Sequence, residues 1–295
     1  MKLHYLKLAL LALPGIALAQ VSVIDDAGQN VSLPQPARRV VSLAPHTTEL
    51  LYAAGGARQI VGAVEYSDYP PEARKLPRVG DNRAFDLERI IALKPDLLVV
   101  WHYGNSEQQL QKLRQLGIPV FYSEPRKLEQ VATSLERLGL LLGQQATAHQ
   151  AASRYWSQVQ ALRQQYRAAR PVKVFYQVWD KPLMTLNGQH LISDVLRLCG
   201  GENLFARMPA LAPTVSLEAV LASSPEAIIS AAGDSAKRDP LQAWRHFPAL
   251  PAVQRGNLIL LDGDKMSRLG PRIVDGASEL CQKLQKVREQ GPLPQ

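Results

Sequence analysis

Short apolar runs of strand length alternate with longer segments of helical spacing in both halves of the chain. The apolar runs are residues 40–43, 60–62, 97–101 and 120–122 in the first half, and 174–176, 227–230 and 258–261 in the second. Strands separated by helices are typical of parallel sheets. Ligands of such sheets bind beyond the carboxyl ends of the strands. The pattern therefore predicts an α/β fold whose site lies at those ends.

The second half of the chain repeats part of the first. Residues 87–99 align without gaps to residues 217–229, which lie 130 positions later. Both copies indicate a helix capped by Asp86 or Ser216, stopped before a proline and followed by a buried strand. A second repeat pairs residues 49–56 with 194–201, each a helix ended by glycines, where a positive φ is easiest. We expect two similar lobes.

Residues 145–169 have helical spacing and contain no glycine or proline. At 1.5 Å per residue, one helix of about 37 Å would join the lobes. The expected division is an N-terminal lobe at 20–143, a bridging helix at 144–170 and a C-terminal lobe at 171–295, with a ligand cleft between the lobes.

The first nineteen residues have the features of a signal peptide. Lys2 and Lys7 precede an apolar stretch at 8–18, and the sequence at 17–19 fits the small-x-small cleavage pattern. No cysteine follows the cut, so a lipid anchor is not expected. Removal of two lysines lowers the formal net charge from +8 to +6. We expect an exported protein.

Composition and motifs exclude several classes of function. Hydrophobic residues make up 46% and charged residues 20%, as in a folded chain. Lysine and arginine are scattered, so no nucleic-acid partner is expected. The chain contains no nucleophile elbow, zinc-protease, thioredoxin, P-loop or dinucleotide motif. Capture of a solute for a transporter, without a cofactor or catalysis, is the favoured interpretation.

Cys199 and Cys281 are the two cysteines of the chain. In an oxidising compartment such a pair more often forms a bond than stays free, so we expect one disulfide. Its loop of 82 positions would contribute about 4.5 kcal/mol in the chain-entropy model. Two buried free thiols are the alternative.

Four segments resemble a known family. They are residues 40–45 with Thr48 and Glu49, residues 66–70, residues 87–90 with 94–96, and residues 199–203. Together they are similar to the periplasmic cobalamin (vitamin B12) binding proteins of ABC importers, within the helical-backbone class of substrate-binding proteins. The resemblance implies a periplasmic monomer that delivers a corrinoid to an inner-membrane permease dimer. Haem, siderophore and metal-ion binders share that fold and remain alternatives; a periplasmic enzyme is a further one.

Two aromatic residues lie at predicted strand ends. Tyr66 follows the strand that ends near Val64, and Trp101 closes the strand at 97–101. Flat aromatic rings offer a macrocycle a large contact area at little entropic cost. Core packing is the alternative, most of all for Trp101. The resemblance places both residues against the corrinoid.

Asp264 and Arg268 follow the strand at 258–261 and are expected at the edge of the cleft. Such a pair can hydrogen-bond amide groups and also satisfy itself when the lobes close. A surface ion pair of little energetic value is the alternative. The resemblance favours a role in ligand binding.

Three positions depart from the family pattern. Asn82, Val178 and Ala212 stand where the family would offer aromatic side chains to the ligand. We include Asn82 among the expected ligand-binding residues, and Trp179 as a substitute for a missing aromatic.

His46 and His102 each follow a predicted strand, where an imidazole can coordinate cobalt, haem iron or zinc. A closed protein-ligated metal site needs three or four ligands, and no such cluster is visible in the sequence. No metal site of the protein itself is therefore expected.

Glu88 and Glu218 occupy the same place in the two repeats, in the first turn of a helix. Lobes related by a pseudo-twofold axis would present both carboxylates on one face, to the two halves of a symmetric permease. A favourable interaction with the helix dipole, about 0.3–1 kcal/mol, is the alternative. The resemblance implies that they dock the importer.

Overall fold

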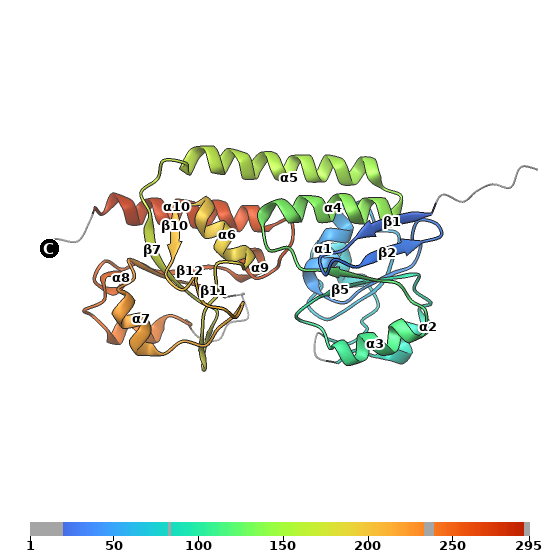
Figure 1. The fold of residues 1–295 in the computed structure, drawn as a ribbon, viewed down its shortest axis with the longest axis horizontal. Helices are drawn as coiled ribbons and strands as arrows, with labels where there is room; N and C mark the ends of the chain where they lie inside the picture. Colours follow the sequence, from blue (N-terminus) through green and yellow to red (C-terminus); the bar gives the residue numbers. More distant parts are fainter. Residues whose placement is uncertain (1–19, 82–83, 233–238, 292–295) are drawn as a thin grey trace, which may run out of the picture.

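The computed structural model describes residues 20–81, 84–232 and 239–291. The expected signal peptide at 1–19 therefore lies outside the described residues. Two α/β lobes stand side by side beneath one long helix (Figure 1). The predicted fold class of two similar lobes with mainly parallel sheets and a bridging helix is confirmed. In the described part of the chain, no helix combines the length and the apolarity that crossing a membrane requires.

The N-terminal lobe is built on one parallel sheet with the strand order β4-β3-β5-β6. Its strands are β3 (Val40–Ser42), β4 (Ile60–Ala63), β5 (Leu97–Trp101) and β6 (Val120–Ser123). An antiparallel hairpin, β1 (Val21–Ile24) and β2 (Asn30–Leu33), precedes it. The helices are α1 (Pro45–Ala53), the 3-10 helix η1 (Pro71–Lys75), α2 (Leu87–Ala92), α3 (Glu107–Gln115) and α4 (Leu128–Leu142).

The C-terminal lobe has a second parallel sheet, in the order β10-β7-β11-β12. Its strands are β7 (Val172–Gln177), β10 (Gly201–Asn203), β11 (Ala227–Ala232) and β12 (Leu258–Asp262). A short hairpin joins β8 (Trp179–Asp180) to β9 (Leu183–Met184). The helices are α6 (Leu191–Leu198), α7 (Leu217–Ser223), the 3-10 helix η2 (Gln242–His246), α8 (Pro251–Gln254), α9 (Gly263–Met266) and α10 (Ile273–Glu289).

The repeat detected in the sequence is a repeat of structure. Both predicted caps form, because the Asp86 carboxylate accepts a hydrogen bond from the backbone N–H three residues later at 2.9 Å and the Ser216 hydroxyl does so at 3.1 Å. Gly55 and Gly200, just after α1 and α6, have φ of 91° and 69°. Residues with a Cβ rarely adopt such angles, which explains the glycines at both helix ends. The two lobes share these local rules.

Helix α5 (Gln145–Tyr166) extends over both lobes (Figure 1). The expected helix ran to residue 169, whereas the observed one ends three residues earlier. Buried residues of α4, α5 and α10, among them Leu135, Val159 and Leu284, belong to one hydrophobic core that continues through both lobes. Such a shared core is stiffer than a coil linker. The boundaries at 143/144 and 170/171 stay predictions.

The predicted disulfide is confirmed. Cys199 and Cys281 are bonded, with an S–S distance of 1.99 Å, and both residues are fully buried. The bond joins the end of α6 to the middle of α10, so it links two elements of the C-terminal lobe to each other.

Candidate ligand-binding site

A cavity of about 360 Å³ lies between the two lobes. The N-terminal lobe contributes Trp101, Tyr103 and Glu124, which follow or end β5 and β6. The C-terminal lobe contributes Tyr176, Gln177, Val178, Leu186, His190, Ile192, Leu211, Ala212, Ala231, Ser267 and Leu269. Most of these side chains are apolar or aromatic. Carboxyl ends of both sheets therefore meet at one largely apolar cavity, as expected for this fold class.

Trp101 is fixed by the turn that follows it. Its backbone N–H donates to Asn105 Oδ1 at 2.7 Å, and Asn105 Nδ2 donates to the Leu43 carbonyl at 2.9 Å. A Cβ on Gly104 would stand 1.8 Å from Cε3 of the indole. Only glycine leaves room for the ring in this place. The sequence from Trp101 to Asn105 thus holds an aromatic wall at the cavity.

The ring of His46 packs against the same indole. It is buried in α1, and its ring meets Trp101 edge-on with 5.8 Å between centroids. Burial lowers the pKa of His46 to about 3, so the imidazole is neutral and serves as a packing group. The His102 ring packs edge-on against Tyr103 and Tyr122. Across the described stretches of the chain, no three His, Cys, Asp or Glu side chains cluster closely enough to hold a metal ion.

Glu124 directly follows β6 and is 5% exposed. Its backbone N–H donates to Asp26 Oδ2 at 2.7 Å, which fixes this residue to the N-terminal hairpin. Burial raises the pKa of the Glu124 carboxyl to about 7, although the Trp101 indole, the Tyr103 backbone N–H and Arg126 oppose the shift. A buried carboxyl group that titrates near neutral pH therefore belongs to the wall of the cavity.

The opposite wall has its polar groups paired within the protein. At the end of β7, Gln177 Nε2 donates to the Pro240 carbonyl at 2.8 Å, and Gln177 Oε1 accepts from Trp244 Nε1 at 2.6 Å. His190 Nδ1 caps α6 by accepting from the Ile192 N–H at 3.1 Å. Burial lowers the pKa of His190 to about 4, with a smaller contribution from Arg126. The imidazole is neutral at pH 7.

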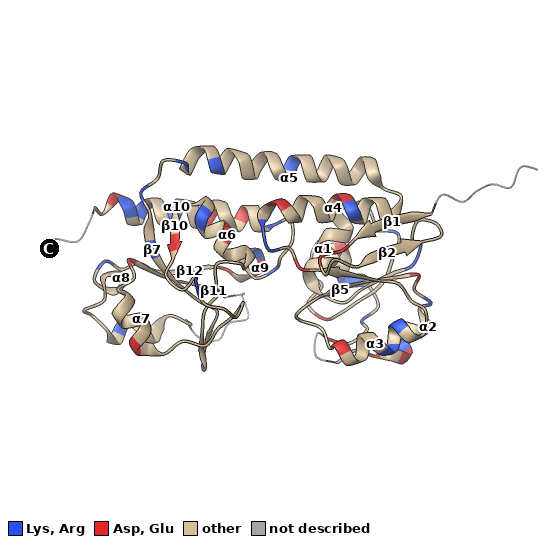
Figure 2. Ribbon diagram, in the orientation of Figure 1, with Lys and Arg blue, Asp and Glu red and all other residues tan. Residues whose placement is uncertain are grey.

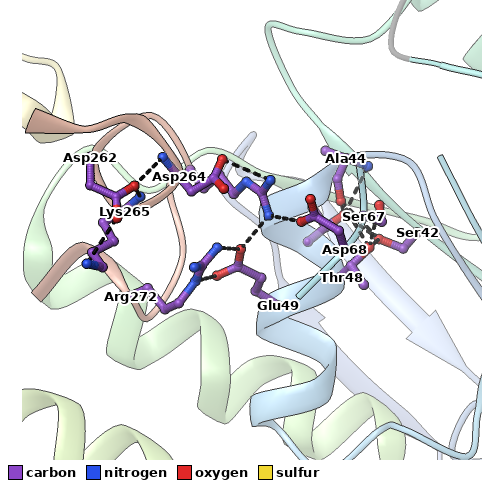
Figure 3. A network of polar contacts seen from close by, with 12 residues as sticks. Ser42, Ala44, Thr48, Glu49, Ser67, Asp68, Asp262, Asp264, Lys265 and Arg272 are labelled. Atoms are coloured by element: carbon purple, nitrogen blue, oxygen red, sulfur yellow. Dashed lines mark hydrogen bonds and ion pairs between the residues drawn. The ribbon is translucent and has the colours of Figure 1, made fainter. Parts of the chain in front are cut away.

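Glu49 and Arg268 form an ion-pair network that links the lobes beside the cavity (Figure 3). Arg268 Nη1 lies 2.6 Å from Asp68 Oδ1 and 3.2 Å from Glu49 Oε1, and its Nη2 lies 3.0 Å from Asp264 Oδ1. Arg272 donates a fork of two bonds to Glu49, of 2.9 and 2.6 Å. We call these five side chains the clamp. Glu49 and Asp68 come from the N-terminal lobe, and the other three from the C-terminal lobe.

The centre of the clamp is buried, whereas the side chains of Asp68 and Asp264 are 40% and 49% exposed. The side chain of Glu49 is 2% exposed and that of Arg268 is 12% exposed. Burial raises the pKa of Asp68, but the hydrogen bond and charge of Arg268 outweigh it and lower that pKa overall. The Arg272 guanidinium also stacks 3.9 Å above the centroid of the Tyr69 ring. Each buried charge thus has a partner of opposite sign.

The structure places the expected ligand-binding residues unequally. Trp101 lines the cavity, together with Val178 and Ala212 at two of the departures from the family pattern. Asp264 and Arg268 contact one another as expected, and Ser267 and Leu269 on either side of Arg268 line the cavity. The Arg268 guanidinium itself is engaged between the lobes.

The remaining expected residues lie elsewhere. Tyr66 is 74% exposed, has φ of 64°, and does not belong to the described lining of the cavity. Trp179 is 59% exposed, and its indole N–H donates to the Lys181 carbonyl at 3.0 Å, outside that lining. Asn82 lies outside the described residues. For Tyr66, Trp179 and Asn82, a role in binding stays a prediction.

Glu88 and Glu218 are equivalent in the structure as in the sequence. Both are exposed in the first turn of α2 and α7, and the residue two positions later, Ile90 or Val220, is buried in each case. Hydrogen bonds from its own backbone and from the Ser216 hydroxyl lower the pKa of Glu218. Helices α2 and α7 lie in separate lobes, on the side of the molecule away from α5 (Figure 2).

Sequence reasoning missed several wall residues. Glu124, Gln177 and Ala231 follow or end strands, so the rule that located Trp101 would also have located them. Leu186, His190, Ile192 and Leu211 come from the connections around α6, which no local pattern assigns to the cavity.

Comparisons with known proteins identify the family to which this fold and sequence are similar. The family model described as periplasmic binding protein matches residues 40–265. A vitamin B12-binding protein of Vibrio cholerae serotype O1 is 38% identical to this chain, over 87% of this chain and 92% of its own length. A vitamin B12-binding protein of Yersinia pestis is 40% identical, over 86% of this chain and 88% of its own length.

Solved structures agree with the sequence relatives. The periplasmic vitamin B12 binding protein BtuF of Vibrio cholerae superposes with a TM-score of 0.79 at 38% identity, covering 86% of this chain and 99% of that one. A periplasmic heme-binding protein from Pseudomonas aeruginosa superposes with a TM-score of 0.73 at 26% identity, covering 83% and 91%.

Proposed function

This chain belongs to the periplasmic binding protein family, and we propose that it captures cobalamin or a related corrinoid between its lobes and delivers it to an inner-membrane ABC importer. The expected signal peptide and the family favour the periplasm as its location. The role requires no bond to be made or broken.

The aromatic cavity between the lobes carries the proposal. It joins a wall with Trp101 and Tyr103 to a wall with Tyr176 and several aliphatic side chains. Flat rings and aliphatic groups suit the face and rim of a large macrocycle, and a few polar groups suffice to orient it. The identity of 38–40% to proteins named for vitamin B12 binding supports a corrinoid.

Haem is the competing macrocycle, because a heme-binding protein shares the fold at 26% identity. The two ligands are distinguished by titrating the exported, purified chain with cyanocobalamin, dicyanocobinamide and haemin, followed by calorimetry and absorbance. We expect one corrinoid to bind per chain and haemin to bind more weakly. Tight haemin binding without corrinoid binding would contradict the proposal.

Removal of the aromatic wall tests the pocket itself. The Trp101→Ala change deletes a ring in the cavity and should weaken corrinoid binding roughly 30-fold, about 2 kcal/mol. Trp156→Ala is the matched control, since that half-buried indole lies on α5 and is not among the described wall residues. Unchanged affinity of the Trp101 variant would show that the corrinoid binds elsewhere.

We propose further that Glu88 and Glu218 dock the chain onto the two halves of the importer. Both carboxylates are exposed, and they occupy equivalent positions in the two lobes. A partner with twofold symmetry can offer a basic residue to each of them. The cavity and the two helices use different surfaces, so binding and docking are separable.

Charge reversal tests docking. We expect the double variant Glu88→Lys and Glu218→Lys to keep its corrinoid affinity and to lose stimulation of the reconstituted importer. Glu129→Lys and Glu202→Lys, which reverse exposed charges of the two lobes elsewhere, form the matched control. Normal uptake with the docking variant would refute this role.

A further inference from the structure

Buried polar atoms without a partner are concentrated at the edge of the N-terminal sheet that faces the cavity, and two of the residues concerned, Trp101 and Glu124, line it. Within residues 20–81, 84–232 and 239–291, six buried side-chain nitrogen or oxygen atoms make no hydrogen bond. Five of them belong to His46, Trp101, His102, Ser123 and Glu124, at or near the carboxyl ends of β3, β5 and β6. An unpaired buried polar group costs about 1–3 kcal/mol, so such a concentration calls for a cause.

Two of these atoms are complementary neighbours. Nε1 of Trp101 is a donor, and Oε2 of Glu124 is an acceptor when the carboxyl group is ionised. The indole N–H lowers the pKa of the Glu124 carboxyl as a nearby hydrogen-bond donor does, so the two groups are close, but neither Trp101 Nε1 nor Glu124 Oε2 has a partner with the geometry of a hydrogen bond. Both residues line the cavity, and Glu124 is 5% exposed. The wall therefore holds one free donor beside one free acceptor.

A primary carboxamide carries the matching pair of groups, a carbonyl oxygen beside an N–H. We propose that Trp101 Nε1 donates to the carbonyl oxygen, and Glu124 Oε2 accepts from the N–H, of one peripheral carboxamide of the bound ligand. The inference rests on the proposed function, because a corrin ring is bordered by carboxamides. Haem carries carboxylates, which an ionised Glu124 repels, so the same pair selects against haem. Both atoms are buried, so the side chains around them must move before a ligand reaches them.

The surrounding charges are accounted for by other contacts. Arg126 donates to the Tyr103 hydroxyl at 2.7 Å, and Asp26 is paired with Arg137 at 2.6 Å. On the opposite wall His190, with its lowered pKa, is neutral at pH 7. His102, the neighbour of Trp101 in the chain, also lies near this wall, and its ring packs against Tyr103 and Tyr122.

Proton linkage predicts the direction in which the affinity for the corrinoid changes with pH. An amide N–H that donates to the carboxylate stabilises the ionised form, so binding lowers the pKa of Glu124 and releases a proton. Affinity then falls as the pH drops through about 7. Between pH 7.5 and 6.0 we expect a loss of roughly eightfold. Glu124→Gln should bind roughly tenfold more weakly at pH 7.5 and lose this part of the pH dependence.

Calorimetry with cyanocobalamin at several pH values tests the pair in the wild type, Glu124→Gln and the exposed control Glu129→Gln. A second probe is the set of cyanocobalamin monocarboxylic acids, each with one propionamide hydrolysed. One of these acids should bind the wild type at least tenfold more weakly and recover in Glu124→Gln, because the two negative charges no longer meet.

The outcomes separate the two claims. If the wild type binds cyanocobalamin, and Glu124→Gln binds it with equal affinity and the same pH profile, the pair is refuted and the proposed function stands. If the wild type binds no corrinoid, the proposed function itself fails. Unfolding curves of both variants show whether a loss of affinity reflects loss of the fold.

Discussion

The two walls of the cavity occupy equivalent places in the repeat and differ in what they leave unpaired. Trp101 ends β5, and Ala231, 130 positions later, stands at the matching place in β11; both line the same cavity. The N-terminal wall carries an unpaired donor and acceptor, whereas Gln177 on the C-terminal wall bonds to Pro240 and Trp244. The repeat thus supplies a common frame, and divergence at the strand ends supplies the site.

The relative position of the two walls is fixed by contacts outside the cavity. The clamp pairs Glu49 and Asp68 of one lobe with Arg268 and Arg272 of the other, and the core of α4, α5 and α10 runs through both lobes. Polar groups that are paired inside the protein stabilise the fold. Polar groups left unpaired at a cavity cost free energy, which a ligand that bonds to them recovers. The comparison therefore predicts opposite consequences for mutations in the two kinds of place.

The largest effect is expected from breaking the clamp. Glu49→Gln removes the charge that faces both Arg268 and Arg272, and it leaves two buried guanidinium groups without their shared carboxylate. Loss of one partner in a buried pair costs about 3–5 kcal/mol in the free energy of unfolding. Urea unfolding followed by circular dichroism measures the loss.

Glu136→Gln is the control for the clamp variant. Its carboxylate pairs with His149 at 3.1 Å, but the side chain is 51% exposed, so the change should cost less than about 1 kcal/mol. Similar costs for the two variants would mean that the clamp contributes no more than a surface pair.

A smaller effect on stability is expected from the paired wall. Gln177→Leu leaves Trp244 Nε1 buried without its acceptor, and it should lower the free energy of unfolding by about 1–3 kcal/mol. Trp244→Phe in the same chain removes the stranded donor, and the pair of changes should cost less than the sum of the single changes. A purely additive double variant would argue against the hydrogen bond as the cause.

Glu124→Gln is the contrasting change on the other wall. We expect it to lower the affinity for the corrinoid and to leave the free energy of unfolding nearly unchanged. A drop in stability for Glu124→Gln that equals the drop for Gln177→Leu would erase the difference between the walls.

Much of the frame followed from local sequence. The strand at 97–101 was predicted with its observed bounds, the caps Asp86 and Ser216 form, and glycines follow α1 and α6 at positive φ. Each of these features depends on residues a few positions apart. The pairing of Cys199 with Cys281 followed from the compartment and the cysteine count, which needed no geometry.

The contacts of the side chains at the site were harder to predict from the sequence. The Arg268 side chain was expected at the ligand, but Glu49 and Asp68 of the other lobe engage its guanidinium. These partners lie about 200 positions away in the chain, and no local pattern connects them. The strand-end rule would have placed Glu124 at the cavity, but its burial could not be predicted in the same way, because its backbone is bonded to Asp26 of the distant N-terminal hairpin.

The sequence by itself determined the alternation of strands and helices, the repeat of the two lobes, the long helix between them and the disulfide. Hydrophobic period, capping residues and glycines act over a few residues, so they can be read along the chain. Only the tertiary structure decided which charges pair across the lobes and which polar atoms stay unpaired at the cavity. Desolvation and pairing depend on every group that surrounds an atom, and those groups come from distant parts of the chain.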